Sequence, residues 1–263
     1  MNSVSDFGMP ADHRSYPPPA TSWLMRQVWH DLLFAHWPMP PDALRALIPP
    51  GLSLDIFDGQ AWLGIVPFRM SGIRPRFLPA LPWLSAFPEL NARTYVIAGD
   101  RPGVWFFSLD AGNPVAVAVA RRAFHLPYFN AQMGLAREPF LFNVSSPLDW
   151  IAYTSTRTHR HAPPASFTAR YRPIDDVRPA QPGTLEHWLT ERYCLYATDR
   201  AGRLYRGEIH HAPWPLQPAE AEITTNTIAA AAGISLPDTQ PLLHFARRLD
   251  VLIWAIGQLR VEG

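Results

Sequence analysis

Residues 91–109 read NARTYVIAGDRPGVWFFSL and carry the clearest structural signal in the chain. Two runs rich in β-branched and aromatic residues, 91–97 and 104–109, flank the cluster GDRPG at residues 99–103, which holds the residue types that turns require. We therefore predict a β-hairpin here, and with it antiparallel sheet structure.

The flanking segments extend this pattern toward the N-terminus. Residues 23–36 predict a strand, and residues 43–48 predict a short helix between proline-rich boundaries. Residues 52–56 and 61–68 predict a second hairpin that turns at Asp58-Gly59. The proline-rich segment 69–89 is too punctuated for regular structure and too apolar for a free linker, so we expect a long packed loop that borders a cavity.

The C-terminal half is also dominated by strands. Asn113 and Pro114 predict the cap and first position of a helix at 115–124, which Pro127 ends, although the alternation of Val and Ala also fits a strand. We predict a helix at 184–190 and further strands at the following positions: 140–144, 151–156, 166–171, 193–197, 204–210, 221–225 and 249–256. The expected fold is mainly β (α+β), with one antiparallel domain at 21–263 after a disordered tail at 1–20.

Composition excludes several classes of function. The chain has 263 residues and a formal net charge of +1, and its arginines are scattered, so we expect no nucleic-acid partner. All 23 basic residues counted as Lys+Arg are arginine, which excludes a lysine Schiff base, covalently held pyridoxal phosphate and a P-loop lysine. With no signal-like start and no long apolar run, we expect a cytoplasmic protein without a membrane partner.

Common catalytic motifs are missing from the sequence. It contains no G-x-S-x-G, H-E-x-x-H, G-x-G-x-x-G or Walker A pattern. The single cysteine, Cys194, cannot form an internal disulfide, and we expect it to be a buried, inert thiol. His159 and His161 lie among arginines and prolines, which favours an exposed loop over a metal site. We expect no metal and no cofactor.

Two predicted strands gather polar residues on one face. Arg206, Glu208 and His210 alternate along 204–210, and Asn91, Arg93 and Tyr95 alternate along 91–97. Either face can be a site, or a solvated face whose charges pair across strands. If the second face looks inward, Arg93 needs an anionic ligand or an internal carboxylate such as Glu89 or Glu208.

The chain as a whole resembles a known family from about Trp23 to Trp254. The resemblance rests on the stretches 36–52, 66–70, 87–96, 106–110, 120–122, 126–128 and 206–211. These residues are similar to the YqjF-like family of uncharacterised proteins in the acetoacetate decarboxylase-like superfamily. The resemblance implies an antiparallel β-barrel whose interior forms a small-molecule cavity.

Comparison with true acetoacetate decarboxylases implies that their chemistry is lost. Their Schiff-base lysine corresponds to Tyr128, and the neighbouring lysine corresponds to Phe129. Their substrate-binding arginine falls around residues 26–30, which include His30, and none of their acidic positions clearly survives. Schiff-base decarboxylation is therefore ruled out by this position and by the absence of lysine.

Two functional hypotheses follow. In the first, the protein binds a small anionic ligand, an organic acid, in a cavity lined by Tyr128, Arg93, Arg69, Asn91 and His30. Any lyase or isomerase step then uses Glu208 or His210 for proton transfer and Tyr128 as a hydrogen-bond donor. In the second, the barrel is packed, its arginines form internal ion pairs, and the protein is a non-catalytic binding or scaffold protein. The sequence leaves open whether it is an enzyme and whether it forms a homo-oligomer.

Overall fold

The computed structural model describes residues 9–81, 83–138 and 149–259. The strands are β1 (Met25–Met39), β2 (Ser53–Leu54), β3 (Ala61–Pro75), β4 (Phe87–Ala98), β5 (Arg101–Ala111), β6 (Tyr128–Glu138), β7 (Trp150–Arg157), β8 (Ser166–Pro173), β9 (Cys194–Thr198), β10 (Leu204–His210), β11 (Leu216–Asn226), β12 (Leu242–Ile253) and β13 (Gly257–Gln258). The helices are α1 (Pro41–Arg45), α2 (Pro114–Ala123), α3 (Leu185–Thr190) and a 3₁₀ turn at Ala230–Ala232. The mainly β prediction is confirmed.

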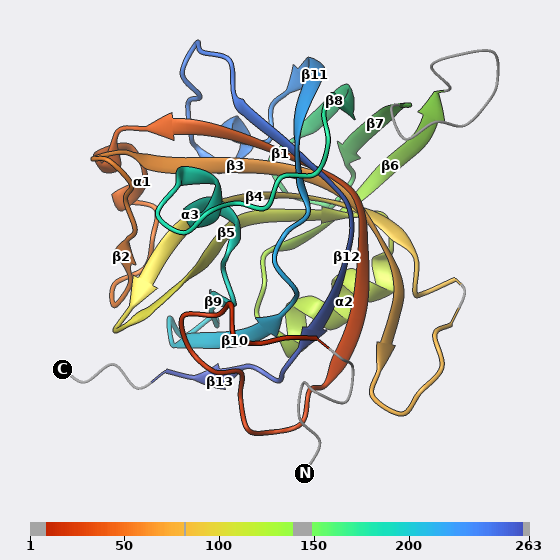
Figure 1. Ribbon diagram of the computed structural model, residues 1–263. Helices are drawn as coiled ribbons and strands as arrows, with labels where there is room; N and C mark the ends of the chain where they lie inside the picture. Colours follow the sequence, from red (N-terminus) through yellow and green to blue (C-terminus); the bar gives the residue numbers. More distant parts are fainter. Residues whose placement is uncertain (1–8, 82, 139–148, 260–263) are drawn as a thin grey trace.

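Strand pairing closes the described sheet into two rings that share a wall (Figure 1). The shared wall runs β12-β1-β3-β4-β5. On one side β6, β7, β8 and β11 complete a nine-stranded barrel. On the other side β9 and β10 complete a seven-stranded ring, in which β9 runs parallel to β5 and β10 pairs with β12. The wall is therefore buried on both of its faces.

Alternation of side chains along the wall separates the two interiors. On β1, Leu33 and Ala35 enter the core of the nine-stranded barrel, whereas Leu32 and Phe34 face the seven-stranded ring. The nine-stranded barrel is filled by aromatic and aliphatic side chains, including the fully buried Tyr153. The described core on this side consists mainly of packed apolar side chains, so we expect a site that combines space with polar groups in the seven-stranded ring.

Several local predictions are confirmed. The hairpin at 91–109 is the antiparallel pair β4–β5. Asn113 caps α2, because its side chain accepts hydrogen bonds from the backbone N–H groups of Val115 and Ala116, so the helix prevails over the alternative strand. The side chain of Thr184 likewise caps α3.

Other local predictions are corrected. The turn at Asp58-Gly59 exists, but β2 pairs with β4 and not with β3, because the backbone N–H of Asp55 donates to the carbonyl of Tyr95. The expected loop at 69–89 shrinks to 76–86, since β3 continues to Pro75 and β4 begins at Phe87. Strand β6 was not predicted, and the predicted strand at 140–144 lies outside the described residues.

The N-terminal segment also differs from its composition-based prediction. Residues 9–20 do not form a free tail, and residues 1–8 lie outside the described part. The Arg14 side chain is buried against β10, where Nη1 donates to the carbonyl of Ile209 and Nη2 lies 3.6 Å from a Glu208 carboxylate oxygen. The ring of Tyr16 lies under the guanidinium of Arg101 at 3.9 Å. Composition could not show these long-range partners.

Gly103 allows β5 and β9 to approach and close the seven-stranded ring. A Cβ atom there would lie 2.6 Å from Cys194 Sγ and 2.8 Å from the Cys194 carbonyl oxygen. We expect Gly103→Ala to lower the free energy of unfolding by about 1–3 kcal/mol, measured by urea denaturation. Gly257→Ala is the matched control, because a Cβ there meets nothing within 4 Å and neither glycine has a positive φ. Equal losses in both variants would contradict the packing argument.

Candidate ligand-binding cavity

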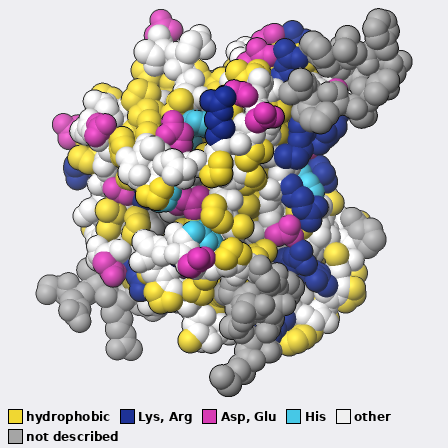
Figure 2. Space-filling view, in the orientation of Figure 1, with side chains coloured by type: hydrophobic (Ala, Val, Ile, Leu, Met, Phe, Trp, Pro, Cys, Tyr) yellow, Lys and Arg dark blue, Asp and Glu magenta, His cyan; other side chains and the backbone are white. Residues whose placement is uncertain are grey.

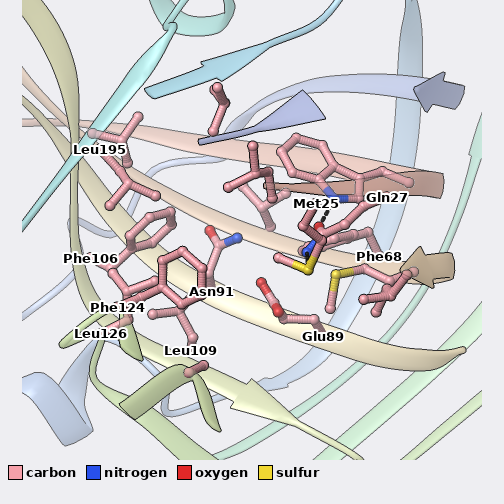
Figure 3. A pocket seen from close by; sticks show the side chains of 18 of the residues that line it. Met25, Gln27, Phe68, Glu89, Asn91, Phe106, Leu109, Phe124, Leu126 and Leu195 are labelled. Atoms are coloured by element: carbon pink, nitrogen blue, oxygen red, sulfur yellow. Dashed lines mark hydrogen bonds between the residues drawn. The ribbon is translucent and has the colours of Figure 1, made fainter. Parts of the chain in front are cut away.

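The seven-stranded ring encloses a cavity of about 290 Å³. Its walls come from β1, β3, β4, β5, β6, β9, β10, β12 and α2, and most of the lining is apolar, as the Phe, Leu and Met side chains of Figure 3 show. The apolar lining includes Leu32, Val66, Phe68, Met70, Phe87, Leu109, Phe124, Leu126, Ile209 and Ile253. An apolar pocket of this size with a few polar groups is typical of small-molecule sites.

Strand β4 supplies a row of polar side chains to this apolar cavity. Glu89, Asn91 and Arg93 line it, whereas Leu90 and Ala92 between them enter the packed barrel. Figure 3 shows Glu89 and Asn91 projecting from β4 among the apolar side chains. All three polar residues are buried, so the row is fixed by the alternation of a strand that is covered on both faces.

Glu89 forms a hydrogen-bonded pair with Tyr128. The Tyr128 hydroxyl donates to Glu89 Oε2 at 2.7 Å, reaching it from the start of β6. Burial raises the pKa of Glu89 to about 7, and the hydrogen bonds from Tyr128 and Asn91 limit that rise. Burial and the adjacent Glu89 also raise the pKa of Tyr128 well above its ordinary value. Near neutral pH the Glu89 carboxyl therefore exists in both protonation states, which suits proton transfer.

Arg93 is a buried cation without a counter-ion among the described residues. Its guanidinium lies over the rings of Phe34 and Tyr95, at 5.3 Å and 5.8 Å from their centroids. Its Nε is buried and has no hydrogen-bond partner, and its side chain forms no ion pair within the described chain. Gly64 leaves room for it, because a Cβ there would lie 3.4 Å from Arg93 Cγ and 3.0 Å from His36 Nε2.

Further unsatisfied polar atoms belong to residues around the same cavity. Arg192 lines it and pairs with Asp55, but its Nη2 is buried without a partner. The indole nitrogen of Trp214 and the amide oxygen of Asn91 are also buried without partners. Together with Arg93 these residues offer more donors than acceptors, which matches an anionic ligand.

The structure brings three of the predicted site residues together, namely Tyr128, Asn91 and Arg93. It places Arg69 and His30 elsewhere, as register partners across β3 and β1, outside the set that lines the cavity. His30 donates to or accepts from Ser71 Oγ at 2.7 Å, and Arg248 is its register partner on β12. Figure 2 shows basic side chains gathered on the right of the molecule.

Glu208 and His210 also lie away from the cavity. They share the outer face of β10, whereas Ile209 between them lines the cavity. Glu208 pairs with Arg206 at 3.0 Å, and the N-terminal Arg14 covers both residues, with Nη1 3.3 Å from His210 Nδ1. Burial and Arg14 lower the pKa of His210 to about 4. The alternation on β10 was predicted correctly, but the interior lies on its other face.

Sequence reasoning missed several polar residues of the cavity, among them Glu89, Arg192 and Trp214. Glu89 was considered only as an internal partner of Arg93, although it continues the alternation of Asn91 and Arg93 by one more step along the strand. Arg192 and Trp214 are distant in sequence from β4 and gave no local signal. Only the closure of the ring by β9 and β10 brings them to the cavity.

Metal-binding clusters and membrane-spanning helices are both absent from the described residues. No group of three or more His, Cys, Asp or Glu side chains there is arranged to hold a metal ion. None of the helices in that part of the chain has the length and hydropathy of a membrane span.

Comparison with known proteins identifies the family. The sequence pattern of DUF2071, described as "Uncharacterized conserved protein (COG2071)", matches residues 26–250. The chain belongs to the DUF2071 family. It is 49% identical over 234 residues to "Uncharacterized protein YqjF" of Bacillus subtilis (strain 168), an alignment that covers 89% of this chain and 92% of that protein. The predicted family resemblance is confirmed.

Solved structures similar to this DUF2071 protein have acetoacetate decarboxylase-like folds. The enduracididine biosynthesis enzyme MppR complexed with pyruvate has a TM-score of 0.61 at 13% identity, with 94% of this chain and 97% of that chain covered. An acetoacetate decarboxylase-like enzyme from Sphingomonas wittichii RW1 has a TM-score of 0.59 at 17% identity, with 95% and 99% covered. The acetoacetate decarboxylase of Legionella pneumophila has a TM-score of 0.59 at 12% identity, with 99% and 96% covered. At these identities the likeness shows the fold alone.

The raised pKa of Glu89 makes stability depend on pH. Because the folded state holds the proton up to about pH 7 and the unfolded chain releases it near 4.5, the contribution of Glu89 to stability is largest below pH 4.5 and is lost as pH rises through 7. We expect the wild type to lose about 3 kcal/mol relative to Glu89→Gln over this interval, measured by urea unfolding at a series of pH values. Parallel pH profiles for the two proteins would contradict this expectation.

The hydrogen bond from Tyr128 stabilises the ionised form of Glu89. We therefore expect Tyr128→Phe to raise the pKa of Glu89 above its value of about 7. Titration followed by carbon NMR on carboxyl-labelled glutamate measures this directly, and the Glu89→Gln variant assigns the resonance. A pKa that stays the same or falls would show that Tyr128 does not hydrogen-bond the carboxylate.

Proposed function

We propose that the cavity binds a small organic acid, with the ligand carboxylate paired to Arg93. The observation that carries the proposal is the buried Arg93 guanidinium, which has no counter-ion among the described residues. An unpaired buried charge is costly, and a guanidinium cannot lose its proton at physiological pH, so a bound anion is the physical means of neutralising it. The planar donors of arginine also suit a carboxylate.

The Glu89–Tyr128 pair supplies proton transfer to the same cavity. In the proposed isomerase-type step, the ionised Glu89 takes a proton from a ligand carbon next to a carbonyl group, and the electron pair left on that carbon moves onto the carbonyl oxygen as an enolate. The C–H bond breaks, an O–H bond forms on Glu89, and the proton then returns to the same or a neighbouring ligand atom. This step needs no oxidant or reductant and no lysine. In this proposal Glu89 transfers the proton, a role that the sequence analysis gave to Glu208 or His210. Tyr128 keeps its predicted role as a hydrogen-bond donor.

Two further observations support a ligand over a fully packed scaffold. The scaffold hypothesis expects the arginines to be held by Glu89, Glu208 or Asp110, and two of these carboxylates do pair with arginine. Glu89 instead accepts from Tyr128 and leaves Arg93 available. The structurally similar MppR was solved with pyruvate, an organic acid, which makes this ligand class a reasonable first choice for the present chain.

Binding is tested by thermal-shift and calorimetric titration of the purified full chain with a panel of organic acids. We expect an acid to raise the melting temperature of the wild type. Arg93→Gln should raise the Kd of that acid by roughly 30-fold or more, because it removes the buried cation that pairs with the carboxylate.

Arg69→Gln is the matched control, because Arg69 belongs to the same sheet but does not line the cavity. It should bind the acid like the wild type. Equal weakening in both variants would indicate a non-specific charge effect. The absence of any acid-induced shift, with all variants folded by circular dichroism, would favour the scaffold hypothesis.

A further inference from the structure

We infer that the acid is an amphipathic monocarboxylic acid with an extended apolar body. Its carboxylate lies at the deep, polar end of the cavity, and its hydrocarbon part runs past Glu89 toward the mouth. This inference rests on the proposed function, because it takes Arg93 as the carboxylate site. It adds the length and polarity of the ligand, which the charge of Arg93 alone does not determine.

The distance between Arg93 and Glu89 along β4 requires a long ligand. Arg93 and Glu89 are four residues apart on a regular strand, so their Cα atoms are separated by about 13 Å. The Arg93 guanidinium stays at its own level, held over Phe34 and Tyr95, and Glu89 is held by Tyr128. An acid of two or three carbons bound at Arg93 therefore does not extend to the proton-transfer pair, whereas a longer chain does.

The space between these two groups is apolar. Val66 and Leu109 are the cross-strand neighbours of Asn91, and Phe68 is the neighbour of Glu89 on β3. All three apolar side chains line the cavity. Asn91 is thus the polar exception in a hydrocarbon-like passage, and an apolar ligand body fits this passage better than a second charged or hydroxylated group.

The cavity becomes more exposed in the direction away from Arg93. Pairing along the strands leads from Phe87 to Met70 on β3, and then to Pro75, which pairs with Met25 at the start of β1. These four residues line the cavity, and Pro75 is exposed, whereas Arg93 is buried. The charged end is therefore the deep end, and an acid enters with its carboxylate first.

The rim of the mouth is mainly apolar, and its polar member Gln27, close to Met25, accepts a hydrogen bond from the indole N–H of Trp29. Val119 of α2 lines the cavity and is 55% exposed, and Leu84 and Ile73 lie on the same lining. The adjoining loop carries Trp83, which is 66% exposed and whose carbonyl accepts from the Asn113 side chain at 3.0 Å. An apolar ligand body that reaches the rim is therefore in contact with mainly apolar surface.

The test is calorimetric titration of the full chain with unbranched saturated carboxylates from acetate to decanoate. Each methylene that enters the apolar passage should lower the Kd by about fourfold, until the chain reaches the mouth and the Kd becomes constant. The alcohol of the same length as the best acid should bind at least 30-fold more weakly, since it offers no charge to Arg93.

A variant that shortens the cavity tests the direction of the chain. Ala116 and Ala120 of α2 line the cavity with small side chains, whereas Ala118 of the same helix does not line it. Ala116→Phe should weaken long acids by tenfold or more and leave short acids unchanged, and Ala118→Phe should change neither. Ala120→Leu repeats the experiment with a smaller side chain if Ala116→Phe does not fold.

The outcomes separate the two proposals. Both proposals are supported if binding depends on Arg93, strengthens with chain length, and is weakened by Ala116→Phe for the long acids only. Arg93-dependent binding with a Kd that is independent of chain length, or that rises with it, overturns the extended apolar body and leaves the acid site standing. If no carboxylate binds, or if Arg93→Gln leaves the Kd unchanged, the proposed acid site fails and the inference fails with it.

Discussion

The structure depends on a five-stranded wall that is buried on both faces. Because successive side chains of a strand point to opposite faces, placing Leu90 and Ala92 in the packed barrel forces Glu89, Asn91 and Arg93 into the cavity. A one-residue slip of β4 would put two charged groups into a hydrocarbon core, so the register is strongly specified. Packing on the barrel side of the wall thus positions the polar groups that face the cavity on its other side.

Buried charges in this chain are neutralised in different ways. Asp110 and Asp55 are paired with Arg157 and Arg192. Glu89 has no arginine partner in the described chain, and burial raises its pKa to about 7, so it can hold a proton instead. An arginine cannot lose its proton in the same way, so the buried charge of Arg93 is the one that a bound anion would neutralise.

The sequence predicted the fold better than it predicted the site. Local signals such as the turn at 99–103 and the cap at Asn113 were sufficient for the elements they belong to. The resemblance to the decarboxylase-like superfamily pointed to Tyr128, which lines the cavity, whereas the ring of Phe129 packs against the guanidinium of Arg157 at 4.1 Å. For Glu208 and His210, alternation along the strand showed that they share a face of β10. It did not show that this face is the outer one. That depends on how β10 closes the ring and on the N-terminal segment that covers its outer side.

The N-terminal segment has a practical consequence for the handling of the protein. Its proline-rich composition invites removal of the first twenty residues when an expression clone is designed. Such a truncation would delete Arg14 and Tyr16, uncover His210 and Glu208, and leave the ring of Tyr193 without the guanidinium that stacks on it at 4.4 Å. The outer surface of β9 and β10 would then expose aromatic and charged groups together, which favours self-association of the purified protein. Residues 9–20 are therefore part of the folded unit and should be kept.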